Sequence, residues 1–168
     1  MTEKQKKKKG GGLISTNQNV AVNRRARFEY FLKDTIEAGI QLTGTEVKSL
    51  RHGQCSINEA YVAEDKGQLY LVGATIPVYN PAGAHLQHQP TRRRKLLMHK
   101  REINKFMGAI MKAGMTVIPT RLYFNNVGLA KLEIALGQGK KLHDKRDTSK
   151  ERDWNRDKAR LMRDKKGE

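Results

Sequence analysis

Aromatic and β-favouring residues alternate with polar ones in the first patterned stretch of the chain, "RFEYFLKDTIEAGI". Phe28, Tyr30 and Leu32 fall on one face of a strand, and Gly39 is placed where a bend or bulge would let the chain continue into "IQL". We therefore expect a long bent strand, although "RRARFEYFLKDTIE" also fits a helix.

A short helix and a hairpin are predicted next. In "TGTEVKSLRHG", Thr43 and Glu46 have the spacing of a capping box, and Gly53 can end the helix. The pattern then predicts two strands, 61–64 and 69–76, around the turn "DKGQ".

The segment "NPAGAHLQHQPTRRRK" lacks periodicity, contains two prolines and ends in a basic cluster, which predicts an exposed loop. The helix after it is the clearest in the chain, because "HKREINKFMGAIMKAG" has apolar residues at i, i+3, i+4, i+7 and i+8. These are Ile103, Phe106, Met107, Ile110 and Met111, and Gly114 closes the segment.

A second hairpin follows, with strands over 116–124 and 129–136 joined by "NNVG". Pro119 indicates a sheet edge or a bulge. About six strands with two to three short helices predict a mainly β protein, and a small antiparallel sheet removes its exposed edges most easily by closing into a barrel.

Composition extends this picture to the two ends of the chain. All nine Phe and Tyr residues lie within 28–124, so the packed body is expected there, with one domain over 17–138. The arm 1–16 begins "MTEKQKKKKGGG" and is predicted to be disordered, and 139–168 form a basic tail.

The net charge of +17 and a pI near 10.2 favour a polyanionic partner, foremost nucleic acid. The three segments 1–12, 13–138 and 139–168 carry +4, +8 and +5, so the body is basic in its own right. No apolar run is long enough for a membrane span, no secretory signal is present, and the single cysteine, Cys55, fits a reducing compartment. We expect a cytoplasmic protein.

The sequence offers no complete catalytic or metal-binding motif. "GQGKK" fails the phosphate-loop pattern, His85 and His88 lack further ligands at suitable spacing, and Cys55 has no oriented base. We therefore expect no enzyme, no cofactor and no metal. Arginine-rich runs in the body, "NRRAR" and "RRRK" among them, instead favour contacts with a nucleic-acid backbone.

Three stretches of the sequence, "NRRARFEYFLKDTIEAGIQLTGTEVKSLRHGQCSI", "PTRRRKLLMHKREI" and "GKKLHDKR", resemble the SmpB family, the SsrA-binding proteins of bacteria. The resemblance covers nearly all of 20–163 and implies an oligonucleotide-binding-type (OB-fold) barrel. It also implies a function: binding the tRNA-like domain of transfer-messenger RNA and entering stalled 70S ribosomes for trans-translation. Elongation factor Tu and alanyl-tRNA synthetase would be indirect partners through the RNA, and the protein is expected to be a monomer.

The resemblance also implies an RNA-binding set on the body. Residues matching Asn23, Glu37 and Leu97 would contact the RNA elbow and D-loop. Neighbouring basic residues would contact phosphates, namely Arg24, Arg25, Arg27, Lys48, Arg51, Arg94 and Lys95. The family usually has an Asn-His-Asp-Pro type segment where this chain has "QHQP", which leaves the conformation of that loop open.

The tail has its own pattern. Thr148 and Glu151 have capping-box spacing, and a narrow apolar stripe follows, so we expect disorder in the free protein and a helix once a partner is bound. The resemblance implies that this partner is small-subunit rRNA in the decoding centre and empty messenger channel. The residues implied are Lys140, Lys141, His143, Asp144, Lys145, Arg146, Trp154, Lys158, Leu161 and Met162.

Two other functions remain to be distinguished from this one. A constitutive ribosomal RNA protein would co-purify with every ribosome rather than with stalled ones. A hydrolase acting on peptidyl-tRNA would release peptide without transfer-messenger RNA, and the sequence offers no catalytic residues for it.

Overall fold

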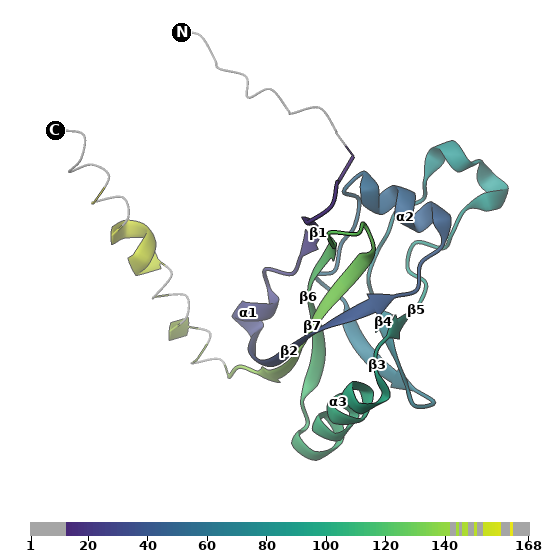
Figure 1. Ribbon diagram of the computed structural model, residues 1–168. Coiled ribbons are helices and arrows are strands. Elements are labelled where there is room, and N and C mark those ends of the chain that lie inside the picture. Colours follow the sequence, from purple (N-terminus) through teal and green to yellow (C-terminus); the bar gives the residue numbers. More distant parts are fainter. Residues whose placement is uncertain are drawn as a thin grey trace, which may run out of the picture.

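The computed structural model describes residues 13–141, 144, 146–147, 150, 153–158 and 162. Within this part of the chain, a single antiparallel sheet of seven strands is accompanied by short helices (Figure 1). The strands are β1 (Gln18–Val22), β2 (Tyr30–Ile40), β3 (Tyr61–Asp65), β4 (Gln68–Val72), β5 (Arg94–Leu97), β6 (Thr116–Phe124) and β7 (Ala130–Gly139). The sheet is accompanied by the α-helices α1 (Ala26–Glu29), α2 (Gly44–Arg51) and α3 (Lys100–Ala113) and by the 3₁₀ turns η1 (Asn80–Ala82) and η2 (Ala84–Leu86).

The sheet closes on itself. Its strand order is β1-β6-β3-β4-β5-β2-β7, and an additional pairing of β6 with β7 completes a ring of six strands, β2 to β7. Strand β1 and strand β3 both pair with β6, β1 along 121–124 and β3 at Val117. The predicted class, a small antiparallel barrel of the oligonucleotide-binding type, is confirmed.

Apolar side chains fill the barrel, and two helices cover its ends. Leu69, Leu96 and Leu132 are buried inside the ring, while α2 contributes Leu50 and α3 contributes Phe106. In Figure 1, α3 lies at the lower end of the barrel and α2 at the upper end. Strand β2 joins α1 to the segment before α2, so its eleven residues separate these helices by roughly 35 Å at about 3.3 Å per residue.

The first predicted strand starts later than expected. One turn of helix, α1, precedes it, because the backbone N–H of Ala26 donates to the side chain of Asn23 and draws the chain into a turn. The irregularity in β2 also lies elsewhere than predicted: the register shifts between Lys33 and Ile36, where Asp34 has a φ of 44°. Gly39 stays in the strand, and its role is to allow close approach, since an added Cβ would lie 3.1 Å from Leu97 Cβ.

Other elements follow the predictions closely. The capping box of Thr43 and Glu46 is present in α2, and β3 and β4 form the predicted hairpin with Lys66 and Gly67 at positive φ in its two-residue turn. The register shift next to Pro119 confirms a bulge in β6. Strands β1 and β5 and the turns η1 and η2 were not predicted from the sequence, the predicted strand 69–76 extends beyond β4, and β7 runs further than predicted.

The apolar stripe of α3 is shorter than predicted. Ile103 and Phe106 are buried and Met107 and Ile110 are partly buried, but Met111 is 77% exposed. Gly114 ends the helix in the left-handed conformation, as expected.

Candidate nucleic-acid interface

Polar side chains from three adjacent strands form a connected group on the outside of the barrel, the outer-face network (Glu37, Arg121, Tyr123, Lys131 and Glu133). Cross-strand register brings them together, since Glu37 is opposite Glu133 and Glu133 is opposite Arg121. In the same way Lys131 is opposite Tyr123. Residues two apart share a face of a strand, so all five point outward.

Ion pairs and hydrogen bonds link these side chains. Arg121 Nε donates to Glu133 Oε2 at 2.8 Å, and Lys131 Nζ lies 3.1 Å from Glu37 Oε1. The hydroxyl of Tyr123 donates to Glu37, and the Arg121 guanidinium lies 4.7 Å from the centre of the Tyr123 ring. Two carboxylates balance two cations, so this surface suits base edges and base faces better than phosphates.

An apolar groove continues from the network at the α2 end of β2. It is lined by Leu42, Leu97, Phe124, Leu129 and Lys131, with a volume of about 430 Å³. Leu97 is 54% exposed and Leu129 is 60% exposed, so both offer flat apolar surface to a partner. We call this hollow the Leu97 groove.

The structure thus brings two sequence-predicted residues together. Glu37 and Leu97 line one shallow pocket on either side of Gly39, with Lys131 beside them. Leu97 is not a core residue, because β5 alternates: Arg94 and Leu96 are buried, whereas Leu97 is exposed and Lys95 is partly exposed.

A second hollow lies at the other end of β2, lined by Arg27, Phe31, Thr35, Glu133 and Lys140 among others. Lys140 Nζ lies 4.8 Å from the centre of the Phe31 ring and donates to the backbone oxygen of Arg27 at 3.1 Å. Phe31 is 46% exposed. Here an exposed aromatic ring and cations adjoin, a combination that suits stacked bases and phosphates.

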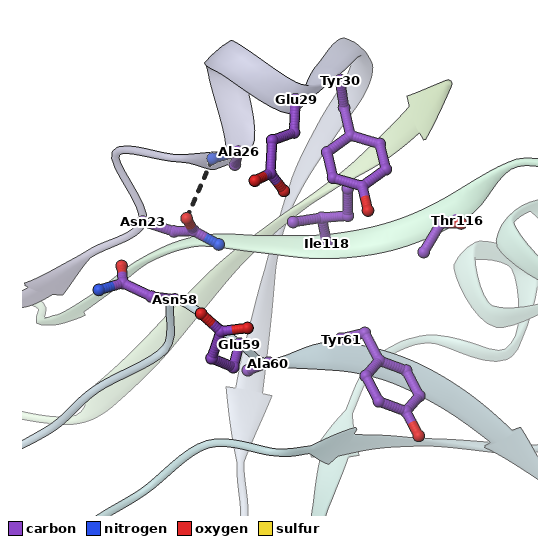
Figure 2. Close-up of a pocket in the computed structure, with 10 residues that line it drawn as sticks. All are labelled: Asn23, Ala26, Glu29, Tyr30, Asn58, Glu59, Ala60, Tyr61, Thr116 and Ile118. Carbon is purple, nitrogen blue, oxygen red and sulfur yellow. Dashed lines mark hydrogen bonds between the residues drawn. The ribbon is translucent and has the colours of Figure 1, made fainter. Parts of the chain in front are cut away.

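Asn23 is buried, in contrast to the predicted RNA contact. Its Nδ2 donates to the backbone oxygens of Ile57 and Pro119 at 3.2 and 3.1 Å, and its Oδ1 accepts from the N–H of Ala26 at 3.0 Å (Figure 2). With only 5% of its surface exposed, Asn23 has its amide fully used inside the protein. The structure gives it the role of fixing α1 and the exposed arginines around it.

Those arginines differ among themselves. All three are exposed, but Arg25 pairs with Glu59 at 2.7 Å and with Glu29 at 3.2 Å. Figure 2 shows the carboxylates of Glu29 and Glu59 on different sides of a pocket of about 230 Å³. This pocket is acidic and therefore disfavours phosphate.

Arg94, predicted to contact RNA, is fully buried. Its Nε donates to Glu46 Oε1 at 2.8 Å, and its other nitrogens donate to backbone oxygens of Ala74, Pro90 and Arg92. No surface of this side chain reaches a ligand, so the prediction for Arg94 is corrected to a structural role.

The partner of Arg94, Glu46, binds a second guanidinium. Arg92 donates to both oxygens of Glu46, at 2.8 and 2.5 Å. Burial acts to raise the pKa of Glu46, but the hydrogen bonds from Arg92 and the Thr43 N–H, together with the charge of Arg94, outweigh it and lower the pKa below its ordinary value. The carboxylate is thus held ionised inside the protein.

Arg51 is also committed to internal contacts. It donates to the backbone oxygens of Ile14 and Gly128 at 2.8 and 3.0 Å, and its guanidinium lies 3.7 Å from the centre of the Phe124 ring. Lys48 is exposed and lies 5.5 Å from the centre of the Tyr79 ring. Lys48, Arg51 and Lys95 were predicted, like Arg94, to contact phosphates. Of these three, only Lys48 and the partly exposed Lys95 offer a charge to a ligand.

The tail is described in part. Residues 153–158 are helical, Trp154 is 70% exposed, and Arg156 pairs with Asp153 at 3.6 Å. The N–H of Lys141 donates to Asp144 at 3.0 Å. Arg146 and Lys158 are exposed, and Met162 is 62% exposed. His143, Lys145, Thr148, Glu151 and Leu161 lie outside the described residues.

Most of the outer-face network was not predicted from the sequence. Arg121, Tyr123, Lys131 and Glu133 were assigned only to strands, although polar residues two apart on both strands are the available signal. Among the described residues, no group of three or more His, Cys, Asp or Glu is placed to hold a metal ion. No helix in the described part of the chain has the length and apolar character needed to cross a bilayer.

Comparison with known proteins gives consistent matches. Residues 20–164 match the family model described as SmpB protein. The SsrA-binding protein of Caulobacter vibrioides is 55% identical over 149 residues, covering 89% of this chain and 97% of that protein. That of Methylobacterium nodulans is 58% identical over 146 residues, covering 87% and 92%. A chain from the solved structure "tmRNA-SmpB: a journey to the center of the bacterial ribosome" has a TM-score of 0.61 at 42% identity, covering 73% of this chain and 85% of that chain.

Proposed function

Because the chain belongs to the SmpB protein family, we propose that it binds the tRNA-like domain of transfer-messenger RNA and delivers it to stalled ribosomes for trans-translation. The observation that carries this proposal is that Glu37 and Leu97 line the same hollow on the outer face of β2, β5 and β7. An acceptor carboxylate next to an exposed apolar side chain suits a base that is splayed out of an RNA loop. The relatives are SsrA-binding proteins, which agrees with an RNA ligand.

In this proposal, the two ends of β2 contact different parts of the RNA. The Leu97 groove and the outer-face network would contact bases of the RNA elbow and D-loop. The exposed Arg24 and Arg27 and the partly exposed Lys140 would contact phosphates near α1, where Lys140 leads into the tail. Arg94 and Arg51 have no place in this contact surface, because their donors are used inside the protein.

The tail would act separately from the body. It leaves the barrel after β7, at the α1 end of β2, while the Leu97 groove lies at the α2 end, roughly 35 Å away. We propose that this tail occupies the empty messenger channel and decoding centre of the small subunit, with Trp154, Leu161 and Met162 as apolar anchors. The exposure of Trp154 and Met162 supports this role, since both side chains are accessible to a partner.

Membership of the family is also the ground for the indirect partners, the oligomeric state and the cellular location that we propose. Elongation factor Tu and alanyl-tRNA synthetase would meet the protein only through the RNA, the protein would act as a monomer in the bacterial cytoplasm, and its role would be binding without catalysis.

The test is the affinity for the isolated tRNA-like domain. Leu97→Ala is expected to weaken binding roughly fivefold, because about half of a leucine surface would no longer be buried against a base. Met111→Ala, which removes an exposed apolar side chain from α3, is the matched control and is expected to bind like the wild type. Equal affinities for both variants and the wild type would contradict the proposed contact.

A further inference from the structure

A stacked group of three side chains lies on the outside of α2, away from the outer-face network. The His52 and Tyr79 rings stack with centres 5.8 Å apart and planes at 25°, and Lys48 Nζ lies 5.5 Å from the centre of the same tyrosine ring. His52 is the C-cap residue of α2, four residues after Lys48, so the two side chains lie on the same side of the helix end. We call this group the Tyr79 platform.

The loop that carries Tyr79 is held in place by hydrogen bonds to both the backbone N–H and the backbone oxygen of Tyr79. The amide of Gln87 donates to the backbone oxygen of Tyr79 at 2.6 Å and accepts from its N–H at 3.0 Å. The loop conformation that "QHQP" left open is therefore fixed in this chain by Gln87. It is fixed further by His88, whose Nε2 donates to the oxygen of Ile76 and whose Nδ1 lies 2.9 Å from Thr45 Oγ1.

Buried polar groups tie the same loop to α2. Ser49 Oγ donates to the oxygen of Pro77 at 2.8 Å, and Glu46 binds Arg92 and Arg94 where the loop returns to the barrel. Ser49, Glu46 and Arg94 have no exposed surface. An exposed loop anchored in this way presents Tyr79 in one position, and a fixed platform loses little conformational entropy when a ligand binds.

The lack of exposed acidic side chains around the platform, together with Lys48, favours an anionic ligand. The loop 73–91, which carries Tyr79, contains no Asp or Glu. The segment 38–58 contains one acid, Glu46, which is buried and paired. Neither element that builds the platform thus carries an exposed carboxylate, in contrast to the outer-face network with its two glutamates.

From these observations, we propose that the Tyr79 platform is a second nucleotide site, which stacks one unpaired RNA base on the exposed His52 ring while Lys48 contacts the adjacent phosphate. Stacked aromatic rings beside a cation bind single-stranded RNA with little sequence preference. This inference rests on the proposed function only in that the ligand is RNA, since it requires neither the tRNA-like domain nor the Leu97 groove.

The experiment measures binding of the full chain to an unstructured RNA of about eight nucleotides, a length within the range that barrels of this type cover. His52→Ala and Tyr79→Ala are each expected to weaken binding by roughly 5- to 150-fold, the range measured for loss of one stacked base. Tyr79→Phe keeps the ring and is expected to bind like the wild type. His85→Ala, an exposed histidine of the same loop, is the matched control.

Two further readouts separate stacking from a general loss of charge. Lys48→Gln is expected to lower the slope of log affinity against log salt by about one, while preserving the base stack. The imidazole proton signals of His52, assigned by their absence in His52→Ala, are expected to move upfield when RNA is added, because they enter the ring current of the base.

The results distinguish this inference from the proposed function. Binding of the octamer that is unchanged by His52→Ala, or a wild type that does not bind the octamer, overturns the inference. If the tRNA-like domain is then still bound through Leu97, the proposed function stands alone. Binding of the octamer through His52 without binding of the tRNA-like domain would reject the proposed function and retain the Tyr79 platform.

Discussion

Replacing Glu46 by alanine is expected to destabilise the protein more than any loss of a surface charge. The carboxylate has no exposed surface, accepts from Arg92, Arg94 and the Thr43 N–H, and joins α2 to the loop before β5. Its removal leaves the buried guanidinium of Arg94 without a counter-charge and removes half of the α2 capping box.

The expected loss is about 3–5 kcal/mol, the cost of breaking a buried ion pair by deleting one partner. The lower part of that range is favoured, because Arg94 keeps its bonds to three backbone oxygens, including those of Ala74 and Pro90. For a chain of this length, about 3 kcal/mol corresponds to a fall in Tm of roughly 6–12 °C. Glu46→Gln keeps the shape of the side chain and is expected to fall between the wild type and Glu46→Ala.

Urea unfolding followed by circular dichroism measures the difference. Glu59→Ala is the matched control, since Glu59 pairs with Arg25 at 2.7 Å but both side chains are more than half exposed. That variant is expected to lose less than about 1 kcal/mol. The reasoning would be refuted if Glu46→Ala and Glu59→Ala lost the same free energy of unfolding.

The stability difference between the wild type and Glu46→Gln has a pH dependence with a definite sign. The pKa of Glu46 is lower in the folded than in the unfolded protein, so its ionised form stabilises the fold at pH values above the ordinary pKa of about 4.3. The stability gap between the wild type and Glu46→Gln is therefore expected to be full at pH 7 and to shrink as the pH falls below that value. A gap that grows on acidification would contradict the lowered pKa.

Three further predictions concern separate parts of the chain. Gly137→Ala is expected to cost about 1–3 kcal/mol in urea unfolding, because the new Cβ would lie 2.6 Å from Ile118 Cδ1, whereas Gly139→Ala, with open space around it, should change stability little. Burial raises the pKa of Cys55 to about 11 against the opposing charge of a nearby arginine, so alkylation at pH 8 should be roughly 100-fold slower than for a free cysteine, and an equal rate would contradict the burial. Trp154→Ala should leave the Tm and the affinity for the tRNA-like domain unchanged and reduce tagging of stalled nascent chains, and a lowered Tm would mean that the side chain packs on the body.

Local sequence patterns predicted most of the barrel because they carry the local physics of each element. The spacing of Thr43 and Glu46 predicted the start of α2, and Pro119 predicted the bulge in β6. The bulge in β2 was misplaced because glycine is the residue that bends a strand at the lowest cost, whereas here Asp34 takes the positive φ. What Gly39 provides, close approach to Leu97, depends on a strand that is distant in the sequence.

The candidate site was predicted less completely, because basic runs do not show which side chains face inward. "RRRK" looked like an exposed cluster, yet Arg94 is buried and Arg92 is largely so. Period-two alternation with Leu96 was the available signal that Arg94 points into the barrel. Its partner Glu46 lies 48 residues earlier in the chain, and no local pattern reveals that contact.

The central claim, that the body binds RNA and the tail acts on the ribosome, is tested most directly by a chain ending after Lys141. This end point keeps the pairing of Gly139 with Tyr30 and the contact of Lys140 with Phe31, so the barrel remains intact. Affinity for the tRNA-like domain and tagging of stalled nascent chains are measured on the same preparation. The account predicts wild-type affinity with tagging abolished, and either a loss of RNA affinity or undiminished tagging would contradict it.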